Sequence, residues 1–374
     1  MKIAVLKETM AGEYRVAATP DTVKKLTGLG HSLTLETGAG QSAGFLDAAY
    51  KEAGAKIAGS ASDALQKADI VLAVRAPSPE TFQMIPEGAT IIALFDPYNA
   101  KDSLSAANQR KLTMLAMEFT PRITRAQSMD ALSSQSNLAG YRAVMEAAVI
   151  YGKAMPMMMT AAGTIAPAKV FVMGAGVAGL QAIATARRLG AVVTATDVRP
   201  AAKEQVASLG AKFIAVEDEE FKAAVTAGGY AKQMSEEYQG KQSELVAKHI
   251  TKQDIVITTA LIPGRPAPEL VTENMVKSMQ AGAVIVDMAV AQGGNCPLSK
   301  PDEIVDIDGV KIAGFSNLPA RLPGDASALY AKNLLAFLPL ITDEEAGLNL
   351  QTEDEIVTAM VLTKNGQTVH ERLL

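Results

Sequence analysis

The sequence predicts an α/β protein built from two doubly wound parallel-sheet domains with a cleft between them. The chain has 374 residues, which is enough for two domains of ordinary size. Short apolar runs alternate with helical patterns that carry start and stop signals. In the second half these runs are mostly unbroken, as expected when helices cover both faces of a parallel sheet.

The first domain is predicted from elements that follow one another up to about residue 120. Thr19 can cap a helix that starts at Pro20, with Gly30 past its end. Strands are expected at the apolar runs Ile3–Leu6, Ser32–Glu36, Ile70–Val74, Thr90–Phe95 and Leu112–Met117. A polar segment, Pro121–Asn137, then precedes a long helix over Leu138–Tyr151.

The second domain starts at Lys169, after a connection rich in methionine. Its expected strands are Val170–Met173, Val192–Thr196, Lys212–Val216, Asp254–Thr259, Ala283–Val290 and Lys311–Phe315. A helix over Ala326–Leu338 is long enough to return the chain to the first domain. Asn365-Gly366 is typical of a tight hairpin, here between Ile356–Thr363 and Gln367–His370. We therefore expect a discontinuous first domain, residues 1–132 and 325–374, and a second domain, residues 133–324.

Composition excludes several classes of protein. Lys plus Arg is 35 and Asp plus Glu is 40, with no basic run, so nucleic acid is not an expected partner. The longest stretch without a charge, Val170–Ala186, has 17 residues with interrupting glycines, too short for a membrane span. The single cysteine, Cys296, cannot form an internal disulfide, and the three histidines show no metal-ligand spacing. The sequence predicts a cytoplasmic protein without a metal site.

The strongest local motif is a glycine pattern between an expected strand and an expected helix. Gly174, Gly176 and Gly179 form Gly-x-Gly-x-x-Gly, the Rossmann-type dinucleotide fingerprint. Asp197 ends the next strand, 23 positions after Gly174, where an acid can accept hydrogen bonds from the adenosine ribose. A carboxylate repels a 2′-phosphate, so NAD is favoured over NADP, although Arg199 could partly offset that repulsion.

Two further segments carry polar or mobile features. Arg122, Gln127, Asp130 and Ser133 supply a guanidinium, an amide, a carboxylate and a hydroxyl on a long connection at the predicted domain junction. A solvated connector is also consistent with this pattern. Gly228-Gly229-Tyr230 lies in a connection too long for a simple turn, which indicates either a mobile flap or a passive surface loop.

Together these stretches resemble a known family along nearly the whole chain. The chain resembles the NAD(H)-binding component, the soluble alpha-1 type of subunit, of proton-translocating NAD(P) transhydrogenases, which are relatives of alanine dehydrogenases. The stretches that carry the resemblance are Glu13–Ala17, Pro121–Ile123, Gln135–Arg142, Gly174–Ala182, Gly228–Lys232, Thr258–Gly264 and Gly293–Cys296.

The resemblance implies a set of site residues. Those expected to act on the nicotinamide, its ribose and the phosphates, and to carry catalysis, are Arg122, Gln127, Asp130 and Ser133. The further implied contacts to NAD(H) are Ser128, Met129, Gly174, Gly176, Val177, Gly179, Asp197, Val198, Arg199, Gly229, Tyr230, Gln242 and Leu261. No metal ligand is implied.

The resemblance also implies an activity and partners. The chain would bind NADH and pass its C4 hydride directly to NADP⁺ on an NADP(H)-binding beta subunit, while a membrane-spanning subunit translocates protons. A homodimer held peripherally at the cytoplasmic face of the inner membrane is expected.

A different activity, that of a stand-alone NAD-dependent amino-acid dehydrogenase of the alanine type, is the alternative. The resemblance implies that such an enzyme uses an Arg, a Lys, a His and an Asp around its substrate. Here Arg15 is kept, but Arg75, Asp96 and Ala291 stand at the other three positions. An arginine cannot shuttle a proton near neutral pH. A nucleotide-binding regulatory module without turnover is a third possibility.

Overall fold

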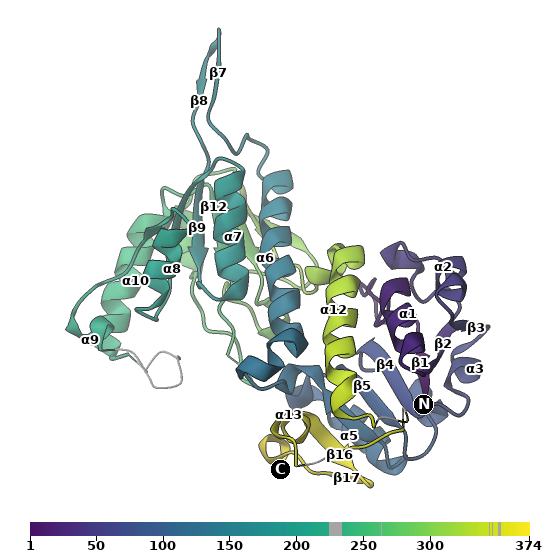
Figure 1. Cartoon of the computed structure of the whole chain (residues 1–374). Coiled ribbons are helices and arrows are strands. Elements are labelled where there is room, and N and C mark those ends of the chain that lie inside the picture. The colour runs from purple at the N-terminus through teal and green to yellow at the C-terminus, as the bar shows by residue number, and fades with distance from the viewer. Residues whose placement is uncertain (224–233, 263, 344, 346, 351–352) are drawn as a thin grey trace. The chain divides into compact units, whose positions relative to one another are not determined.

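The computed structural model describes every residue except 224–233, 263, 344, 346 and 351–352, and the chain folds into two compact units (Figure 1). Unit 1 comprises Met1–Gln135 and Pro319–Leu374, and unit 2 comprises Ser136–Leu318. The chain thus enters unit 2 three residues later, and leaves it six residues earlier, than the sequence-based boundaries of 133 and 324. Both chain ends belong to unit 1.

The sheet of unit 1 has the strand order β17-β16-β6-β5-β4-β1-β2-β3. Its strands are parallel from β3 through β6, whereas β16 pairs antiparallel with β6, and β17 with β16. The strands are β1 (Lys2–Val5), β2 (Ser32–Glu36), β3 (Lys56–Ala58), β4 (Ile70–Arg75), β5 (Thr90–Leu94), β6 (Thr113–Ala116), β16 (Val361–Lys364) and β17 (Gln367–Thr368). The parallel strands agree with the apolar runs expected from the sequence except for β3, which the sequence did not indicate.

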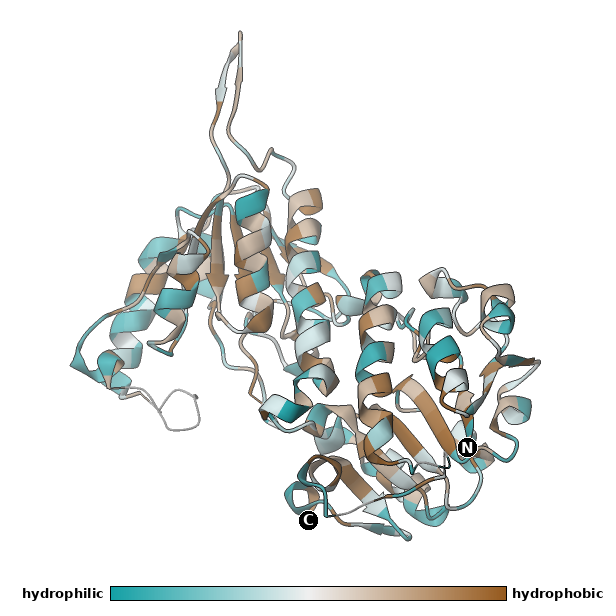
Figure 2. Ribbon diagram, in the orientation of Figure 1, coloured by the Kyte–Doolittle hydropathy of each residue, from teal (hydrophilic) through white to brown (hydrophobic). Residues whose placement is uncertain are grey.

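Helices cover both faces of this sheet, which explains why its strands are apolar on both sides. The helices are α1 (Pro20–Gly28), α2 (Asp47–Glu52), α3 (Ala61–Leu65), α4 (Pro79–Met84), α5 (Lys101–Gln109), α12 (Pro323–Phe337) and α13 (Glu355–Met360). Leu72 packs in a buried cluster with residues of α1 and α12, while its neighbour Val71 packs with residues of α3, α4 and α5. Figure 2 shows these apolar strands beneath helices with polar outer faces.

The C-terminal hairpin differs in part from the prediction. Asn365 and Gly366 have positive φ angles of 53° and 79° and join β16 to β17, so the predicted turn is confirmed. The strand expected over Ile356–Thr363 is wrong in its first half, because α13 occupies Glu355–Met360. The carboxylate of Asp354 caps this helix by accepting a hydrogen bond from the Ile356 N–H at 2.8 Å.

The sheet of unit 2 has the strand order β11-β10-β9-β12-β13-β15-β14 and is parallel except for β14. Its strands are β9 (Lys169–Met173), β10 (Val192–Thr196), β11 (Lys212–Phe213), β12 (Ile255–Thr258), β13 (Val284–Asp287), β14 (Ile304–Ile307) and β15 (Val310–Ala313). The helices that lie wholly within unit 2 are α7 (Val177–Arg188), α8 (Ala202–Ser208), α9 (Glu219–Lys222), α10 (Glu236–Ile250) and α11 (Glu273–Ser278), among the described residues. The chain order reverses between β9 and β12, and ligands of such sheets bind at this switch point.

Helix α6 (Ala131–Ile150) starts in unit 1 and continues in unit 2. It begins seven residues before the helix predicted from Leu138. The reason is that the Asp130 carboxylate accepts a hydrogen bond from the Ser133 N–H and so caps the helix, whose first turns then include the serine-rich stretch. The two doubly wound parallel sheets confirm the predicted fold class. None of the helices in the described part of the chain combines the length and apolar character needed to span a membrane.

The methionine-rich connection forms an antiparallel hairpin, β7 (Met158–Thr160) and β8 (Gly163–Ile165), which the sequence did not indicate. The hairpin projects from the rest of unit 2 (Figure 1). Its side chains are exposed on both strands, including Met158, Met159 and Ile165.

Candidate functional site

The turn between β9 and α7 is shaped by its three glycines. Gly174 has a φ of 106°, and a Cβ there would lie 2.5 Å from Oγ1 of Thr259. A Cβ on Gly179 would lie 1.8 Å from the carbonyl oxygen of Gly174, so only glycine lets helix and strand pack this closely. A Cβ on Gly176 would meet no atom within 4 Å. The turn is therefore tight on the protein side and open at Gly176, as a pyrophosphate approach requires.

Helix α6 packs directly on the start of α7 within unit 2. A Cβ on Gly140 would lie 2.0 Å from the carbonyl oxygen of Ala178, so the two helices meet with backbone in contact. Gly176 precedes the first residue of α7, Val177, and no side chain caps the helix there. The N–H groups of this helix terminus can therefore serve an anion, such as the pyrophosphate of a dinucleotide.

Asp197 fastens this turn to the end of β10. Its Oδ2 accepts a hydrogen bond from the Ala175 N–H at 2.7 Å and another from Nη2 of Arg199 at 2.9 Å. Its Oδ1 accepts from the backbone N–H and Nε of Arg199 at 2.8 and 2.9 Å. Burial alone would raise the pKa of Asp197, but the hydrogen bonds from Arg199 and Ala175 outweigh it and lower the pKa below its ordinary value.

These four donors occupy all the lone-pair positions of the Asp197 carboxylate. A ribose that donates its hydroxyls to Asp197 would have to compete with the side chain of Arg199. The guanidinium also partly neutralises the negative charge that would exclude a 2′-phosphate. The expected part of Arg199 in the choice between NAD and NADP stays a prediction.

The remaining predicted contacts of unit 2 follow the carboxyl ends of neighbouring strands. Val177, Val198 and Leu261 come after β9, β10 and β12, and each exposes about half of its side chain. Such exposed apolar groups at one sheet edge can flank a flat ring. The Gln242 amide instead bridges two chain segments, donating to Oγ1 of Thr196 at 3.1 Å and accepting from the Val216 N–H at 2.9 Å.

Sequence reasoning missed the polar groups that hold these loops. Thr259 donates to the carbonyl oxygen of Gly174 at 3.1 Å. The buried amide of Asn295 accepts from the Ala260 N–H at 3.1 Å and donates to the Ala260 carbonyl at 2.9 Å, next to Leu261. Both residues stand in stretches that carried the resemblance, but nothing local in the sequence indicated their contacts.

The polar segment of unit 1 combines a rigid part and an exposed part. A short 3₁₀ helix spans Thr124–Met129 and leads into α6. The carboxylate of Asp130 accepts hydrogen bonds from the N–H and Oγ of Ser133, at 2.8 and 2.5 Å, so these two predicted residues contact each other. Arg122, Gln127 and Ser128 are exposed. Met129, also predicted as a contact, has a buried side chain in the core of unit 1.

The flap residues Gly229 and Tyr230 lie outside the described residues, so their predicted role stays a prediction.

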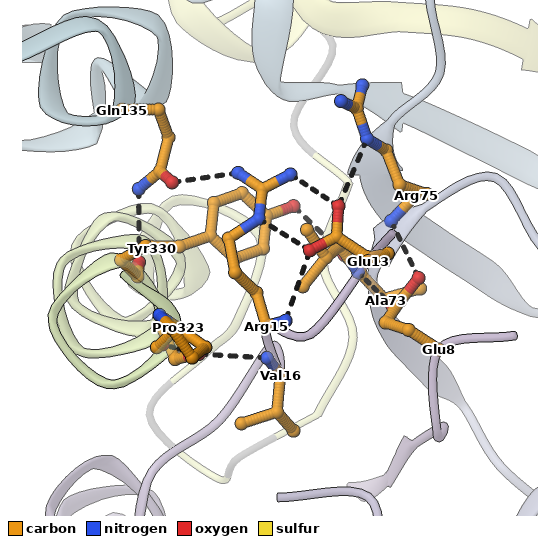
Figure 3. Close-up of polar contacts among 12 residues, drawn as sticks. Glu8, Glu13, Arg15, Val16, Ala73, Arg75, Gln135, Pro323 and Tyr330 are labelled. Atoms are coloured by element: carbon orange, nitrogen blue, oxygen red, sulfur yellow. Dashed lines mark hydrogen bonds and ion pairs between the residues drawn. The ribbon is translucent and has the colours of Figure 1, made fainter. Parts of the chain in front are cut away.

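A buried charged cluster lies at the carboxyl edge of β4 in unit 1 (Figure 3). Arg15 donates to both carboxylate oxygens of Glu13, from Nε at 2.7 Å and Nη2 at 2.6 Å. Its Nη1 donates to Oε1 of Gln135 at 2.8 Å. Arg75 reaches Glu13 at 3.4 Å, and its backbone N–H donates to Glu8. Arg15 is thus engaged on all three of its side-chain nitrogens.

Burial raises the pKa of two carboxylic acids beside this cluster. The pKa of Glu8 rises to about 7, although the N–H groups of Val74 and Arg75 stabilise its charged form. The pKa of Glu118 also rises to about 7, mainly through burial, while its Oε1 accepts from the Asp96 N–H at 2.7 Å. Oε2 of Glu118 is buried and accepts no hydrogen bond from the described residues.

Comparisons with known proteins agree with these features. The chain matches the alanine dehydrogenase/PNT N-terminal domain over residues 4–139 and the alanine dehydrogenase/PNT C-terminal domain over residues 143–371. It is 55% identical over 379 residues to the first part of the NAD(P) transhydrogenase alpha subunit of Rhodospirillum rubrum, covering 100% of this chain and 99% of that protein.

Among solved structures, a transhydrogenase is more similar to this chain than an alanine dehydrogenase is. A transhydrogenase from Sinorhizobium meliloti superposes with a TM-score of 0.90 at 54% identity, covering 99% of this chain and 100% of the other. An L-alanine dehydrogenase superposes with a TM-score of 0.84 at only 26% identity, covering 100% and 98%. The end-to-end matches and the dinucleotide turn lead to one conclusion: the chain belongs to the alanine dehydrogenase/PNT family.

Proposed function

We propose that this chain is the NAD(H)-binding subunit of a proton-translocating NAD(P) transhydrogenase. The observation that carries the proposal is the glycine turn with its Asp197 carboxylate, in a chain 55% identical end to end to a transhydrogenase alpha-subunit protein. Bound NADH would supply the hydride, so the protein itself needs to position the nucleotide and exclude water.

The residues of each unit receive different tasks in this proposal. In unit 2, the start of α7 binds the pyrophosphate, and Asp197 with Arg199 binds the adenosine ribose. In unit 1, Asp130 and Ser133 hold the nicotinamide end, and Arg122 offsets phosphate or carboxamide charge. Gln127, exposed on the 3₁₀ helix, faces the second nucleotide. The Asp130–Ser133 contact supports this division, because it gives the segment a fixed geometry.

The acid-base chemistry of an amino-acid dehydrogenase has little support in unit 1. Arg15, the one residue kept from the alanine dehydrogenase set, has its guanidinium bound to Glu13 and Gln135. Arg75 cannot accept a proton near neutral pH. Hydride transfer between two nicotinamides requires no such group, so the residues present fit the transhydrogenase activity better.

We further propose the partners implied by that activity. They are an NADP(H)-binding beta subunit, a membrane-spanning subunit and a second copy of this chain, at the cytoplasmic face of the inner membrane. The Rhodospirillum rubrum relative is named as only a portion of an alpha subunit, which supports the existence of other subunits. The exposed apolar hairpin β7–β8 supports a protein partner for unit 2.

The test is a reconstitution of the chain with a purified NADP(H)-binding component. We expect the mixture to transfer hydride from NADH to NADP⁺, whereas neither component does so alone. Tight NADH binding without transfer would instead indicate a regulatory nucleotide-binding module. Sustained NAD⁺ reduction by alanine in the absence of any partner would establish the amino-acid dehydrogenase.

A further inference from the structure

A single buried amide on α12 holds both ends of the segment that contains Asp130 and Ser133. Asn333 is only 7% exposed. Its Nδ2 donates a hydrogen bond to the carbonyl oxygen of Ser128 at 2.8 Å, and its Oδ1 accepts one from Oγ of Ser134 at 2.7 Å. Ser128 precedes the segment and Ser134 follows it, so one side chain fixes its entry and its exit.

A second amide holds the same segment one residue further on. The buried Gln135 donates from Nε2 to the carbonyl oxygen of Ala326, in the first turn of α12, at 3.0 Å. Its Oε1 accepts from Arg15, which Glu13 holds in turn (Figure 3). Gln135 also donates to Oγ of Ser134 at 3.3 Å, which joins the two amides into one polar network.

The hydrogen bonds of this network fix the orientation of each amide. A buried amide that uses its donor and its acceptor at once is satisfied in only one orientation, and a shifted loop would leave polar groups buried without partners. The apolar side chains of Met129 and Ala131 add a second restraint, because they pack in the same buried cluster as Leu334 of α12. The segment that contains Asp130 and Ser133 is therefore held in place by side chains of α12 and by Gln135, which lie outside it.

We propose that Asn333 is a positioning residue for hydride transfer, acting through the Ser128–Ser134 segment. This inference rests on the proposed function of that segment. Small errors in the placement of reacting groups reduce rates strongly, while the binding energy of the nucleotide comes largely from other contacts. A change at Asn333 should therefore lower the maximal rate of transfer more than the affinity for NADH.

The test compares two substitutions on the same helix. Asn333→Leu keeps a similar side-chain size and removes both hydrogen bonds to the loop. Tyr330→Phe is the matched control, because it also removes one buried hydrogen bond of α12, but that bond joins Oη to the carbonyl oxygen of Ala73 in β4 at 2.9 Å. Ser134→Ala is a third variant that removes one of the two bonds made by Asn333, together with the longer bond from Gln135 to Ser134.

Amide hydrogen exchange of the full chain and reconstituted transfer are the two measurements. For Asn333→Leu we expect exchange in residues 126–134 to be about tenfold faster and maximal transfer about tenfold slower, with NADH affinity within about twofold. Tyr330→Phe should leave the exchange of this segment and the transfer rate unchanged, even if its melting temperature falls. Ser134→Ala should lie between the two.

Loop exchange and transfer in Asn333→Leu equal to those in Tyr330→Phe would overturn the inference. Exchange is measured on the chain alone, so it decides whether Asn333 holds the loop even if the wild-type protein transfers no hydride. Absence of wild-type transfer would contradict the proposed function and with it the role of Asn333 in transfer, whereas faster loop exchange in Asn333→Leu would still show that Asn333 holds the loop.

Discussion

Gln127 and Asp130 stand three residues apart but are held in different ways. Asp130 accepts two hydrogen bonds from Ser133 and caps α6, so its position is set by the helix. Gln127 is exposed on the preceding 3₁₀ helix. Asp130 is suited to hold one end of a nucleotide still, and Gln127 to contact a group that comes from outside the chain.

Shortening Gln127 should therefore separate transfer from binding. Gln127→Asn keeps the amide but withdraws it by one methylene, so we expect reconstituted hydride transfer to fall about tenfold. NADH affinity should stay within about twofold, because the proposed pyrophosphate site in unit 2 would supply most of it. Gln66→Asn, an exposed site in the same unit, is the control. A large loss of affinity with unchanged transfer would contradict the role given to Gln127.

Glu118 should make stability depend on pH near neutrality. Its folded pKa of about 7 lies above the ordinary value of 4.5, so between these values the folded chain holds a proton that the unfolded chain has released. The free energy of unfolding should therefore fall as pH rises through this window. Glu118→Gln removes the cost of the buried charge. The free energy of unfolding of this variant should therefore exceed that of the wild type by about 1–3 kcal/mol at pH 8.

Urea unfolding between pH 4.5 and 8 measures this effect. The exposed Glu52→Gln is the control and should follow the wild-type profile. Glu8, with a pKa also raised to about 7, keeps some of the slope in the Glu118→Gln variant. A Glu118→Gln profile parallel to that of the wild type would show that Glu118 is already ionised in the fold.

The three glycines of the turn between β9 and α7 have different surroundings, so their substitutions should have different effects. Gly179→Ala would place a Cβ 1.8 Å from the Gly174 carbonyl oxygen, so we expect a loss of about 3 kcal/mol in unfolding free energy. Gly176→Ala meets no protein atom and should lose about 1 kcal/mol or less, yet lower NADH affinity at least about tenfold.

Denaturant unfolding and NADH titration distinguish the two glycine variants. Equal losses of unfolding free energy would show that glycine is required at both positions for packing within the protein, and not at Gly176 for the approach of a ligand. Retained NADH affinity in a folded Gly176→Ala protein would contradict the pyrophosphate site.

Local sequence patterns predicted an element correctly where the contacts that stabilise it are also local in the sequence. The helix from Pro20, the central parallel strands and the Asn365-Gly366 turn all rest on contacts within a few residues or on simple burial. Asp308-Gly309 was an equally clear turn signal and joins β14 to β15, but β14 was overlooked. The strand predicted over the apolar residues of α13 is wrong because a short buried apolar run suits a strand and a helix equally.

The candidate site was predictable only in part for a similar reason. The glycine turn and Asp197 follow from a motif whose residues are close in sequence. Asn333 and Asn295 act on chain segments 205 and 35 residues away, and a lone asparagine in a helix or loop carries no sign of such a partner. The hydrogen bond from Arg15 to Gln135, 120 residues away, could not be predicted from the sequence for the same reason.

The exposed hairpin β7–β8 is not explained by the packing of a single chain. Isolated two-stranded hairpins are marginally stable in water, and this one exposes apolar side chains on both strands. Met159 is 77% exposed. A second copy of the chain, which the proposed homodimer supplies, would cover these side chains.

Light scattering of two matched variants tests this role of the hairpin. We expect a wild-type mass of about twice the 39.2 kDa of the chain, and a mass near that of one chain for Met159→Asp. Met10→Asp, at an exposed methionine of unit 1, should remain dimeric. A dimeric Met159→Asp protein would remove the hairpin from the proposed interface.

In the proposed reaction, hydride passes directly from NADH to a second nicotinamide, and no protein group carries it. The most direct test uses NADH with deuterium at the transferable C4 position, reconstituted with the NADP(H)-binding component in ordinary water. We predict that the deuterium is recovered in NADPH, and that the reverse labelling, in heavy water with unlabelled NADH, introduces none. Loss of the label to solvent during turnover would contradict direct transfer.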